Sequence, residues 1–333
     1  MINGKETVAK STEQNRVIEA LKHTLGIKTP SPLQQIDASS LGYANDISLW
    51  CKRDDLLHPI ISGNKWRKLQ PILSKALLND VKSCLSFGGA YSNHLHALAY
   101  CCHKLGIRLT AIIRGERPTN LSPTLADIES WGTQLHFVTR QEYKSRDKLE
   151  QIKKYKLQFN AELIIPEGGS SEDAVFGMHS LVEEIKATNQ HFDVLYAPVG
   201  SGATLAGLIH YSQPICKKVI GVAVLKGEGY LESLVSQLLP KGVIDEARNH
   251  WQIEHNFHHG GYAKTSPELD EFINAFSNTT EIDVEKVYSA KCMFAIHSYI
   301  TRDIIKPNSK ILFLHTGGLQ GKRTIRRSIS EPL

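Results

Sequence analysis

Short apolar runs alternate with longer amphipathic stretches along most of the chain. The runs span three to six residues, as buried strands do, and the stretches between them have the spacing of helices. Strands that recur at intervals of about 25 to 30 residues, with helices between them, predict a parallel α/β sheet. The expected strands are Ser48–Arg53, Ser83–Phe87, Leu109–Ile113, Gln134–Val138, Leu163–Ile165, Val194–Ala197, Val219–Val224 and Lys310–Leu314.

Helical periodicity fills most of the intervals between these strands. Residues 1–30 read as a polar lead-in with a short predicted helix at Val17–Leu21. A second helix is expected to begin just after the capping Asn64 and to kink or break at Pro71, because proline removes a backbone donor. The other expected helices are Asn93–Leu105, Ser122–Trp131, Glu172–Ala187, one after Gly202, and stretches near 230–239, 267–277 and 291–304.

The size of the chain predicts two lobes. Its 333 residues exceed the usual single-core domain, and at 41% hydrophobic residues it can bury a large core. Residues 1–30 lack the apolar core of a signal peptide, and no apolar stretch approaches the roughly 20 residues of a membrane span. We therefore expect a cytoplasmic protein that does not enter a membrane.

Charge and cysteine usage argue against nucleic acid and metal as partners. The net charge of +5 arises from basic and acidic residues mixed along the chain. The only dense basic run favours a solvated helix end over a nucleic-acid site. None of the six cysteines forms a CxxC pair, so buried reduced thiols fit better than disulfides or a metal site. The basic run consists of Lys322, Arg323, Arg326 and Arg327.

The first candidate for chemistry is the lysine of Ser62-Gly63-Asn64-Lys65. A flexible pair leads into an asparagine suited to cap a helix, which places the lysine on the first helical turn. A helix N-terminus disfavours a cation and therefore pushes the amine toward its neutral, nucleophilic form. Such an amine can form a Schiff base. Taken alone, the pattern also fits a solvated surface lysine.

Two glycine-rich turns join predicted strands to predicted helices. In Phe87–His94, Ser92 and Asn93 place short polar side chains at a helix N-terminus, which suits a carboxylate or a phenolic oxygen. An ordinary strand-to-helix turn with a capping residue is the alternative. In 198–207, consecutive amides beside hydroxyls predict a nest for a monophosphate, without the lysine of a Walker A loop. The residues of this nest are Gly200, Ser201, Gly202, Ala203 and Thr204.

Three further residues are weaker candidates. Thr316 offers a neutral hydroxyl in the turn that closes the last predicted strand, and Tyr262 and Tyr288 stand beside turn or cap residues. Each tyrosine also fits a ring packed in the core. A phosphate nest, a Schiff-base lysine, a phenolate contact and a carboxylate site together describe pyridoxal 5′-phosphate with a small amino-acid substrate.

From about residue 30 to 320 the chain resembles the D-cysteine desulfhydrase and 1-aminocyclopropane-1-carboxylate deaminase family. The resemblance rests on four segments in the family's order and spacing: SGNKWRKL, GGAYSNH, GSGATLAGL and HTGG. It implies the tryptophan synthase β-like, fold type II architecture, with two three-layer parallel-sheet lobes. It also implies a large cofactor-binding domain of residues 1–66 and 172–333, a smaller inserted domain of 67–171, a cofactor between them, and a homodimer.

The resemblance also implies roles for single residues. Lys65 matches the lysine that binds the cofactor covalently, and Asn93 the asparagine beside its phenolic oxygen. Ser92 matches the serine that meets the substrate carboxylate, while the glycine-rich turn at 200–204 matches the phosphate loop. Tyr262 and Tyr288 match the two active-site tyrosines, and Ser289 and Thr316 are further cofactor-binding candidates.

Departures from the family pattern bear on the substrate. Enzymes that open the cyclopropane ring carry glutamate directly after the tyrosine matching Tyr288, whereas this chain has Ser289, as the D-cysteine enzymes have a small hydroxyl residue. A neutral hydroxyl near the pyridine nitrogen favours elimination. Tyr91 replaces the usual glutamine, His96 replaces an arginine, and the loop after Tyr262 differs from the family's.

These features predict a pyridoxal phosphate lyase that converts D-cysteine to pyruvate, ammonia and hydrogen sulfide. Lys65 is expected to remove the Cα proton, Ser92 to hold the carboxylate, and Tyr288 and Tyr262 to assist the leaving group. The alternatives are cyclopropane-carboxylate deamination, β-replacement, and a protein that binds the cofactor without turnover. A nicotinamide dehydrogenase is poorly supported, because no acidic residue follows a clean GxGxxG at the required distance.

Overall fold

The structure, a computed structural model, describes residues 4–43, 46–243, 247 and 250–323, with side chains from Thr12 onward. The chain forms two compact units, each with its own sheet. The larger unit comprises the described residues up to Asp80 together with Gly169–Leu319. The smaller unit comprises Val81–Gly168 together with the described residues from Gln320.

The larger unit is built on a six-stranded sheet with the order β1-β2-β10-β7-β8-β9. All neighbouring strands are parallel except β1, which pairs antiparallel with β2. The predicted parallel α/β architecture is therefore confirmed here, with an antiparallel edge strand added. The strands are β1 (Leu33–Ile36), β2 (Ser48–Lys52), β7 (Phe192–Val199), β8 (Cys216–Ala223), β9 (Trp251–Glu254) and β10 (Lys310–Leu314).

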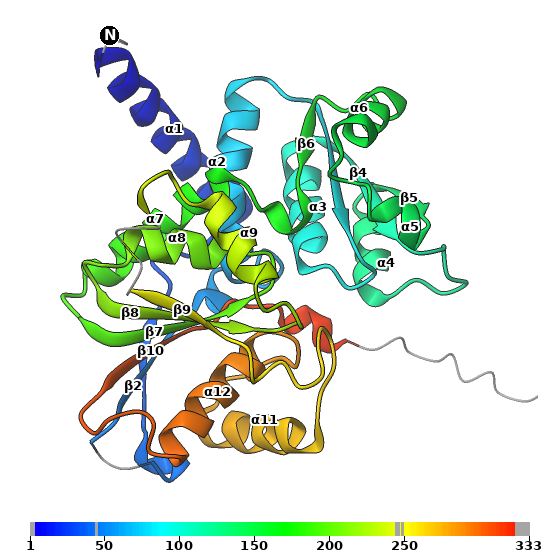
Figure 1. Cartoon of the computed structure of the whole chain (residues 1–333). Coiled ribbons are helices and arrows are strands. Elements are labelled where there is room, and N and C mark those ends of the chain that lie inside the picture. The colour runs from blue at the N-terminus through cyan, green and yellow to red at the C-terminus, as the bar shows by residue number, and fades with distance from the viewer. Residues whose placement is uncertain (1–3, 44–45, 244–246, 248–249, 324–333) are drawn as a thin grey trace, which may run out of the picture. The chain divides into compact units, whose positions relative to one another are not determined.

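Alternating side chains place one hydrophobic core on each face of this sheet. Leu49 and Phe313 belong to the core shared with α11 and α12, whereas Leu195 and Leu312 belong to the core shared with α7, α8 and α9. Figure 1 shows the two sets of helices on opposite faces of the sheet, as a three-layer unit requires. The helices of this unit are α1 (Gly4–Leu25), α2 (Asn64–Leu78), α7 (Glu172–Lys186), α8 (Ala203–Tyr211), α9 (Tyr230–Leu238), α11 (Pro267–Thr280) and α12 (Ser289–Thr301).

The smaller unit has a four-stranded parallel sheet in the order β5-β4-β3-β6. On one face the Cys84 sulfur lies 3.6 Å from that of Cys102 on α3. On the other face Phe87 packs with Tyr155 of α6, so this unit also has three layers. Its strands are β3 (Ser83–Gly88), β4 (Arg108–Arg114), β5 (Gln134–Val138) and β6 (Leu163–Ile165). Its helices are α3 (Asn93–Leu105), α4 (Pro123–Ser130), α5 (Arg140–Tyr143) and α6 (Leu149–Gln158).

The boundaries of the units differ from those expected from the sequence. The expected boundary after residue 66 falls inside α2, which belongs as a whole to the larger unit and packs along α7. α2 also continues through Pro71. The Arg67 carbonyl, which Pro71 cannot bond, faces Gly177 of α7, where a Cβ would lie 1.9 Å from the oxygen. The close packing of the Arg67 turn of α2 against Gly177 of α7 therefore holds α2 in the larger unit.

Some features of the termini and loops differ from, or fall outside, the sequence interpretation. α1 is longer than the expected Val17–Leu21, and short 3-10 turns at Ser39–Leu41, Asp54–Leu56, Glu167–Gly169 and Leu319–Lys322 were not expected. Arg326 and Arg327 of the basic run lie outside the described residues. No helix in the described part of the chain is long and apolar enough to cross a membrane. All six cysteines are buried free thiols.

Candidate active site

The larger unit gathers its functional turns at one edge of the sheet. β7, β8 and β10 are parallel, so the turns that follow them leave from their common C-terminal edge. The turn after β7 is the glycine-rich segment 200–204, and the turn after β10 begins at His315. Ligands of open α/β sheets bind at this edge.

Gly63 places the start of α2 directly against the turn after β10. Its backbone has φ +68° and ψ −149°, a region that is almost restricted to glycine. A Cβ at Gly63 would lie 1.9 Å from the carbonyl oxygen of Thr316, and a Cβ at Gly317 would lie 2.4 Å from the Ser62 hydroxyl. The two backbones touch, so Thr316 lies beside the segment that carries Lys65.

Asn64 does not cap α2, contrary to the expectation from its residue type. The capping position is Gly63, and Asn64 is the first helical residue. Its side-chain amide donates to the Thr204 hydroxyl at 2.8 Å, while its oxygen accepts from the Lys65 amine. Asn64 therefore links the candidate Schiff-base lysine to the candidate phosphate turn.

The Lys65 amine is suited to act as a nucleophile. Lys65 is partly exposed, and burial of its amine lowers the pKa from 10.5 to about 8, while the negative charge of Glu285 opposes this shift. The amine lies 5.9 Å from the centre of the Tyr288 ring. Desolvation is the main cause of the lowered pKa. A fraction of the amine is consequently neutral near pH 7.

Segment 200–204 has the form expected of a phosphate nest. Gly202 has φ +85° and precedes α8, whose first-turn amides have no partners within the helix. Thr204 is buried on the first turn of α8, and Ser201 is partly exposed. The positive φ at Gly202 is the backbone conformation that turns successive amides toward one anion. The segment therefore fits a phosphate group.

Lys68 is a functional candidate that the sequence interpretation missed. It lies one helical turn after Lys65, and its buried amine donates to the Ser201 hydroxyl at 3.4 Å. Burial and the nearby Lys65 amine lower the pKa of Lys68 to about 7. An anion at the 200–204 segment favours the charged form of this amine. The i, i+3 spacing from Lys65 was the available signal.

Arg67 of the same motif has a structural role. Its guanidinium is buried, with ion pairs of 2.8 Å to Asp54 and 2.6 Å to Glu184. Lys52 at the end of β2 also pairs with Glu184, at 2.7 Å. This network joins α2 to β2 and α7. The lysines of α2 are thus presented from a helix that is fixed on two sides.

The two predicted tyrosines lie next to each other. The Tyr288 hydroxyl donates to the Tyr262 hydroxyl at 3.4 Å, and their rings meet edge to face with centroids 6.1 Å apart. A Cβ at Gly200 would lie 3.2 Å from the Tyr288 ring. The structure therefore brings Tyr288 together with Lys65, the 200–204 segment and Tyr262.

Ser289 is joined to a buried carboxylate that the sequence interpretation did not single out. The Glu285 carboxylate accepts backbone bonds from Tyr288 at 2.6 Å, Ser289 at 2.8 Å and Val287 at 2.7 Å. The Ser289 hydroxyl accepts from the Glu285 backbone N–H at 2.8 Å and lies 3.5 Å from its carboxylate. Burial raises the pKa of Glu285, and these bonds together with Lys65 oppose that rise. The surroundings of Ser289 therefore include an acid as well as a neutral hydroxyl.

Ser92 and Asn93 lie in the smaller unit. The Ser92 hydroxyl caps α3 by accepting from the Leu95 N–H at 3.2 Å, and Asn93 accepts from the Gln320 amide. The capping alternative considered for Ser92 is thus present, and it leaves the hydroxyl proton available for a ligand.

The departures near this serine and asparagine have distinct surroundings. Tyr91 is exposed, whereas His96 is buried and its Nε2 lies 2.8 Å from Asp127. Arg323 from the C-terminal segment pairs with the same carboxylate at 2.7 Å. A guanidinium therefore lies close to the position where the family usually has arginine, although it comes from elsewhere in the chain.

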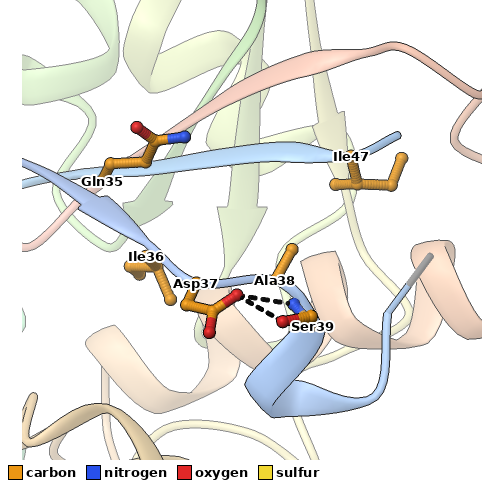
Figure 2. A pocket seen from close by; sticks show the side chains of 6 residues that line it. All are labelled: Gln35, Ile36, Asp37, Ala38, Ser39 and Ile47. Carbon is orange, nitrogen blue, oxygen red and sulfur yellow. Dashed lines mark hydrogen bonds between the residues drawn. The ribbon is translucent and has the colours of Figure 1, made fainter. Parts of the chain in front are cut away.

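A surface hollow in the larger unit is unrelated to the Lys65 site. It is lined by residues 35–39 and Ile47, shown in Figure 2. Because β1 is antiparallel to β2, its end at Ile36 lies at the N-terminal edge of the parallel strands. The Asp37 carboxylate accepts from the Ser39 hydroxyl and N–H at 2.6 and 3.0 Å, so its polar capacity is used locally. No group of metal-ligating side chains occurs among the described residues.

The larger unit fits pyridoxal phosphate by the chemistry of its side chains. A lysine amine of lowered pKa, a glycine-rich helix N-terminus and a second lysine beside it supply a carbonyl-reactive group and an anion site. Residues 25–317 match the family described as pyridoxal-phosphate dependent enzymes. The chain belongs to this family. It is an enzyme whose cofactor is pyridoxal phosphate.

Members of the pyridoxal-phosphate dependent family resemble the chain over most of its length. A bifunctional D-cysteine desulfhydrase/1-aminocyclopropane-1-carboxylate deaminase, mitochondrial, of Arabidopsis thaliana is 29% identical over 321 residues, covering 90% of this chain and 79% of the relative. A putative 1-aminocyclopropane-1-carboxylate deaminase of Thermotoga maritima is 30% identical over 309 residues, covering 88% and 95%. A crystal structure of an ACC deaminase homologue is 25% identical, with a TM-score of 0.69 and coverage of 91% and 95%. The predicted two-lobed fold and family are confirmed.

The lowered pKa of Lys65 predicts the pH dependence of cofactor attachment. In cofactor-free protein mixed with pyridoxal phosphate, the rate of covalent attachment should rise with pH through about 8 and then level off, because the neutral amine reacts. Borohydride trapping followed by mass spectrometry measures this rate. Glu285→Gln removes a charge that raises the pKa of Lys65, so the midpoint should move to lower pH. N-acetyl-lysine amide gives the unshifted reference, and a protein midpoint equal to its value would contradict the assignment.

Proposed function

We propose that the protein is a lyase that eliminates hydrogen sulfide from D-cysteine. Overall, D-cysteine and one water give pyruvate, ammonia and hydrogen sulfide, with the Cβ–S and Cα–N bonds broken and no oxidant needed. The observation that carries this proposal is the grouping of one basic amine with two phenols. Lys65 lies 5.9 Å from the Tyr288 ring, and the Tyr288 hydroxyl donates to that of Tyr262.

Each reacting proton has a candidate group in this arrangement. Bound pyridoxal phosphate withdraws electrons from the substrate Cα, which the side chains alone cannot do. The neutral Lys65 amine takes the Cα proton at Nζ, which its lowered pKa permits near neutral pH. The Tyr288 hydroxyl gives its proton to the departing sulfur, and the phenolate that this leaves then accepts a proton from the Tyr262 hydroxyl, whose oxygen lies 3.4 Å away.

The binding roles are also part of this proposal. Ser92 binds the substrate carboxylate, and Asn93 the phenolic oxygen of the cofactor. Lys68 and the 200–204 segment (Gly200, Ser201, Gly202, Ala203 and Thr204) bind the phosphate. Ser289 and Thr316, both buried hydroxyls at the Lys65 side of the sheet edge, bind the cofactor ring. In this proposal Lys68 neutralises the charge of the phosphate, whereas neutral side chains orient the rest of the cofactor and the substrate.

A second candidate is ring opening of 1-aminocyclopropane-1-carboxylate, giving ammonia and a four-carbon 2-oxo acid. Ser289 was expected to disfavour it, because ring-opening relatives carry glutamate there. The structure supplies a carboxylate from the preceding turn, since Glu285 lies 3.5 Å from the Ser289 hydroxyl. This acid next to Ser289 is the observation that favours the second reaction.

The two candidates are separated by offering both substrates to the purified, cofactor-loaded enzyme. Pyruvate and sulfide are measured with D-cysteine, and 2-oxobutanoate with the cyclopropane amino acid, with ammonia measured in both. We expect release from D-cysteine, and L-cysteine serves as the stereochemical control. Release only from the cyclopropane substrate would establish the second candidate, and turnover of both would make the enzyme bifunctional. Absence of product from both substrates would contradict both proposals.

Glu285 provides a further separation of the two reactions. Glu285→Gln should reduce ring opening more than D-cysteine elimination, because its effect on the pKa of Lys65 is common to both reactions, whereas the acid beside Ser289 is invoked only for ring opening. Lys75→Ala is a suitable control, since Lys75 is exposed on α2, ten residues after Lys65, and pairs with Asp173. Equal losses in both reactions would show that Glu285 acts through the Lys65 amine or the backbone of the 285–289 turn, and not as an acid specific to ring opening.

We further propose that the enzyme is a cytoplasmic homodimer and that its larger unit is the main cofactor-binding domain. The cytoplasm is supported by six buried free thiols, which persist where thiols are kept reduced. The dimer is supported by the family resemblance. Light scattering during gel filtration tests it, because a mass near 37.2 kDa would show a monomer instead.

A further inference from the structure

Lys291 is a buried cation that the proposed reaction does not use. It lies on the first turn of α12, two residues after Ser289, and its side chain is inaccessible to solvent. Its ammonium donates to three backbone carbonyls, those of His258 and Gly261 at 2.9 Å and Val224 at 3.2 Å. An ammonium has three donors, so the three bonds account for all of them.

The three acceptors make this site a cage for a monovalent cation. They are neutral carbonyl dipoles, and carbonyl oxygens arranged in this way replace the hydration shell of ions such as potassium. Val224 follows β8, whereas His258 and Gly261 belong to the turn that precedes Tyr262. Burial lowers the pKa of Lys291 to about 8, and Glu285 opposes the shift. One cation therefore connects α12, the end of β8 and the Tyr262 turn.

The connected turn is held partly by its own hydrogen bonds, because the His258 carbonyl also accepts from the Gly261 N–H at 3.0 Å and the Gly261 carbonyl from the Lys264 N–H at 3.1 Å. Gly260 and Gly261 have φ of +92° and +125°, and Tyr262 is 47% exposed. Because two consecutive glycines give this backbone wide conformational freedom, the position of the Tyr262 hydroxyl depends on what holds the turn. Lys291 binds the carbonyls of His258 and Gly261, which lie before and after Gly260 in the chain. Lys291 itself lies three residues after Tyr288. The cage thus fixes the two phenols relative to each other.

We propose that the Lys291 ammonium is a tethered monovalent cation that positions Tyr262 against Tyr288, and that the emptied cage accepts a free monovalent cation. Lys291 is a positioning residue, because it acts on the reaction through Tyr262. The activity readouts below rest on the proposed function, whereas the stability readouts do not.

Two variants separate the charge of Lys291 from its volume. Lys291→Ala removes both and leaves room in the cage, whereas Lys291→Met fills the room without a charge. Each cofactor-loaded variant is kept at constant ionic strength in tetramethylammonium chloride, which is replaced stepwise by ammonium or potassium chloride. The midpoint of thermal unfolding is recorded first, followed by kcat and KM for pyruvate release from D-cysteine.

We expect ammonium or potassium to raise the unfolding midpoint of Lys291→Ala with saturation, and to restore its kcat by roughly tenfold with little change in KM. Lys291→Met should lose a similar share of kcat and should not respond, because its side chain blocks the cage. Lys217→Ala, an exposed lysine paired with Asp193, is the control for general salt effects. Equal responses of the Ala and Met variants, or of the control, would overturn the proposal.

The unaltered enzyme provides a test that does not depend on the folding of a variant. With the cage filled by Lys291, exchange of tetramethylammonium for potassium or ammonium should leave its unfolding midpoint and kcat unchanged. Saturable activation by either ion would show that the cage is not already occupied by the tethered cation. If D-cysteine is not turned over at all, the proposed function fails, while the thermal response of Lys291→Ala still decides the role of Lys291.

Discussion

Lys65→Ala should abolish covalent attachment of the cofactor and lower kcat by about 10³-fold or more, because one amine is both the attachment point and the base. Its lowered pKa makes Lys65 reactive near neutral pH, and its amine lies beside Tyr288. Lys68 is the nearest alternative amine, but its donation to Ser201 directs it to the phosphate turn. Attachment is measured by borohydride trapping and mass spectrometry, and turnover by pyruvate release.

Lys75→Ala is the matched control for this substitution. It removes a lysine from the same helix, but Lys75 is exposed and its ion pair with Asp173 contributes little to stability. We expect activity within about twofold of the unaltered enzyme for an exposed pair of this kind. Retention of trapped cofactor by Lys65→Ala would instead locate the attachment at Lys68 or another lysine.

The sequence predicted the parts of the fold whose signal is local. Strands such as β3 and β8 are mostly apolar, and the burial of all of β3 and of Val219–Ala223 in β8 on both faces explains why they were recognised. β1 and β9 have four residues each, with polar residues among them, and carry too little periodicity to detect. The length of α1 was underestimated because its first turns are mostly polar.

The candidate site likewise has residues that local sequence predicts and residues that it does not. Lys65 and the 200–204 segment follow from local motifs, because glycine and helix-start patterns lie within a few residues. Asn64 was assigned as a cap from its propensity, yet its partner Thr204 lies 140 residues away. Lys68 meets Ser201 across 133 residues, and Lys291 meets Val224 across 67. These pairings cannot be read from one sequence, even where a residue such as Lys68 stands at a suggestive spacing, because only the folded sheet edge brings the partners together.

Glu285 shows why a motif comparison can mislead about chemistry. The comparison at position 289 finds serine in place of glutamate and suggests a neutral environment. The backbone of the 285–289 turn then brings a carboxylate from four residues earlier to within 3.5 Å of that serine hydroxyl. Glu285, and not the residue at position 289, therefore supplies the acid. Because of this, the residue at position 289 alone does not decide between the two substrates, and an experiment must distinguish them.

Gly63→Ala should destabilise the larger unit by about 3–5 kcal/mol and greatly weaken cofactor attachment. Backbone strain at position 63 and the steric overlap of the new Cβ with Thr316 both contribute to the loss. The backbone at φ +68° and ψ −149° excludes a side chain, and the new Cβ would lie 1.9 Å from the Thr316 carbonyl oxygen. Neither backbone can move without displacing the start of α2 and Lys65. Chemical denaturation measures the loss in the free energy of unfolding, and borohydride trapping measures attachment.

Gly42→Ala separates the two causes. Gly42 also has a positive φ, +73°, but a Cβ there would meet nothing within 4 Å. Its substitution should therefore cost only the left-handed backbone strain of about 1 kcal/mol and leave attachment unchanged. A similar loss for both glycines would mean that backbone strain alone accounts for Gly63. A larger loss for Gly63→Ala, together with slower attachment at Lys65, shows that contact between Gly63 and Thr316 positions the reactive amine.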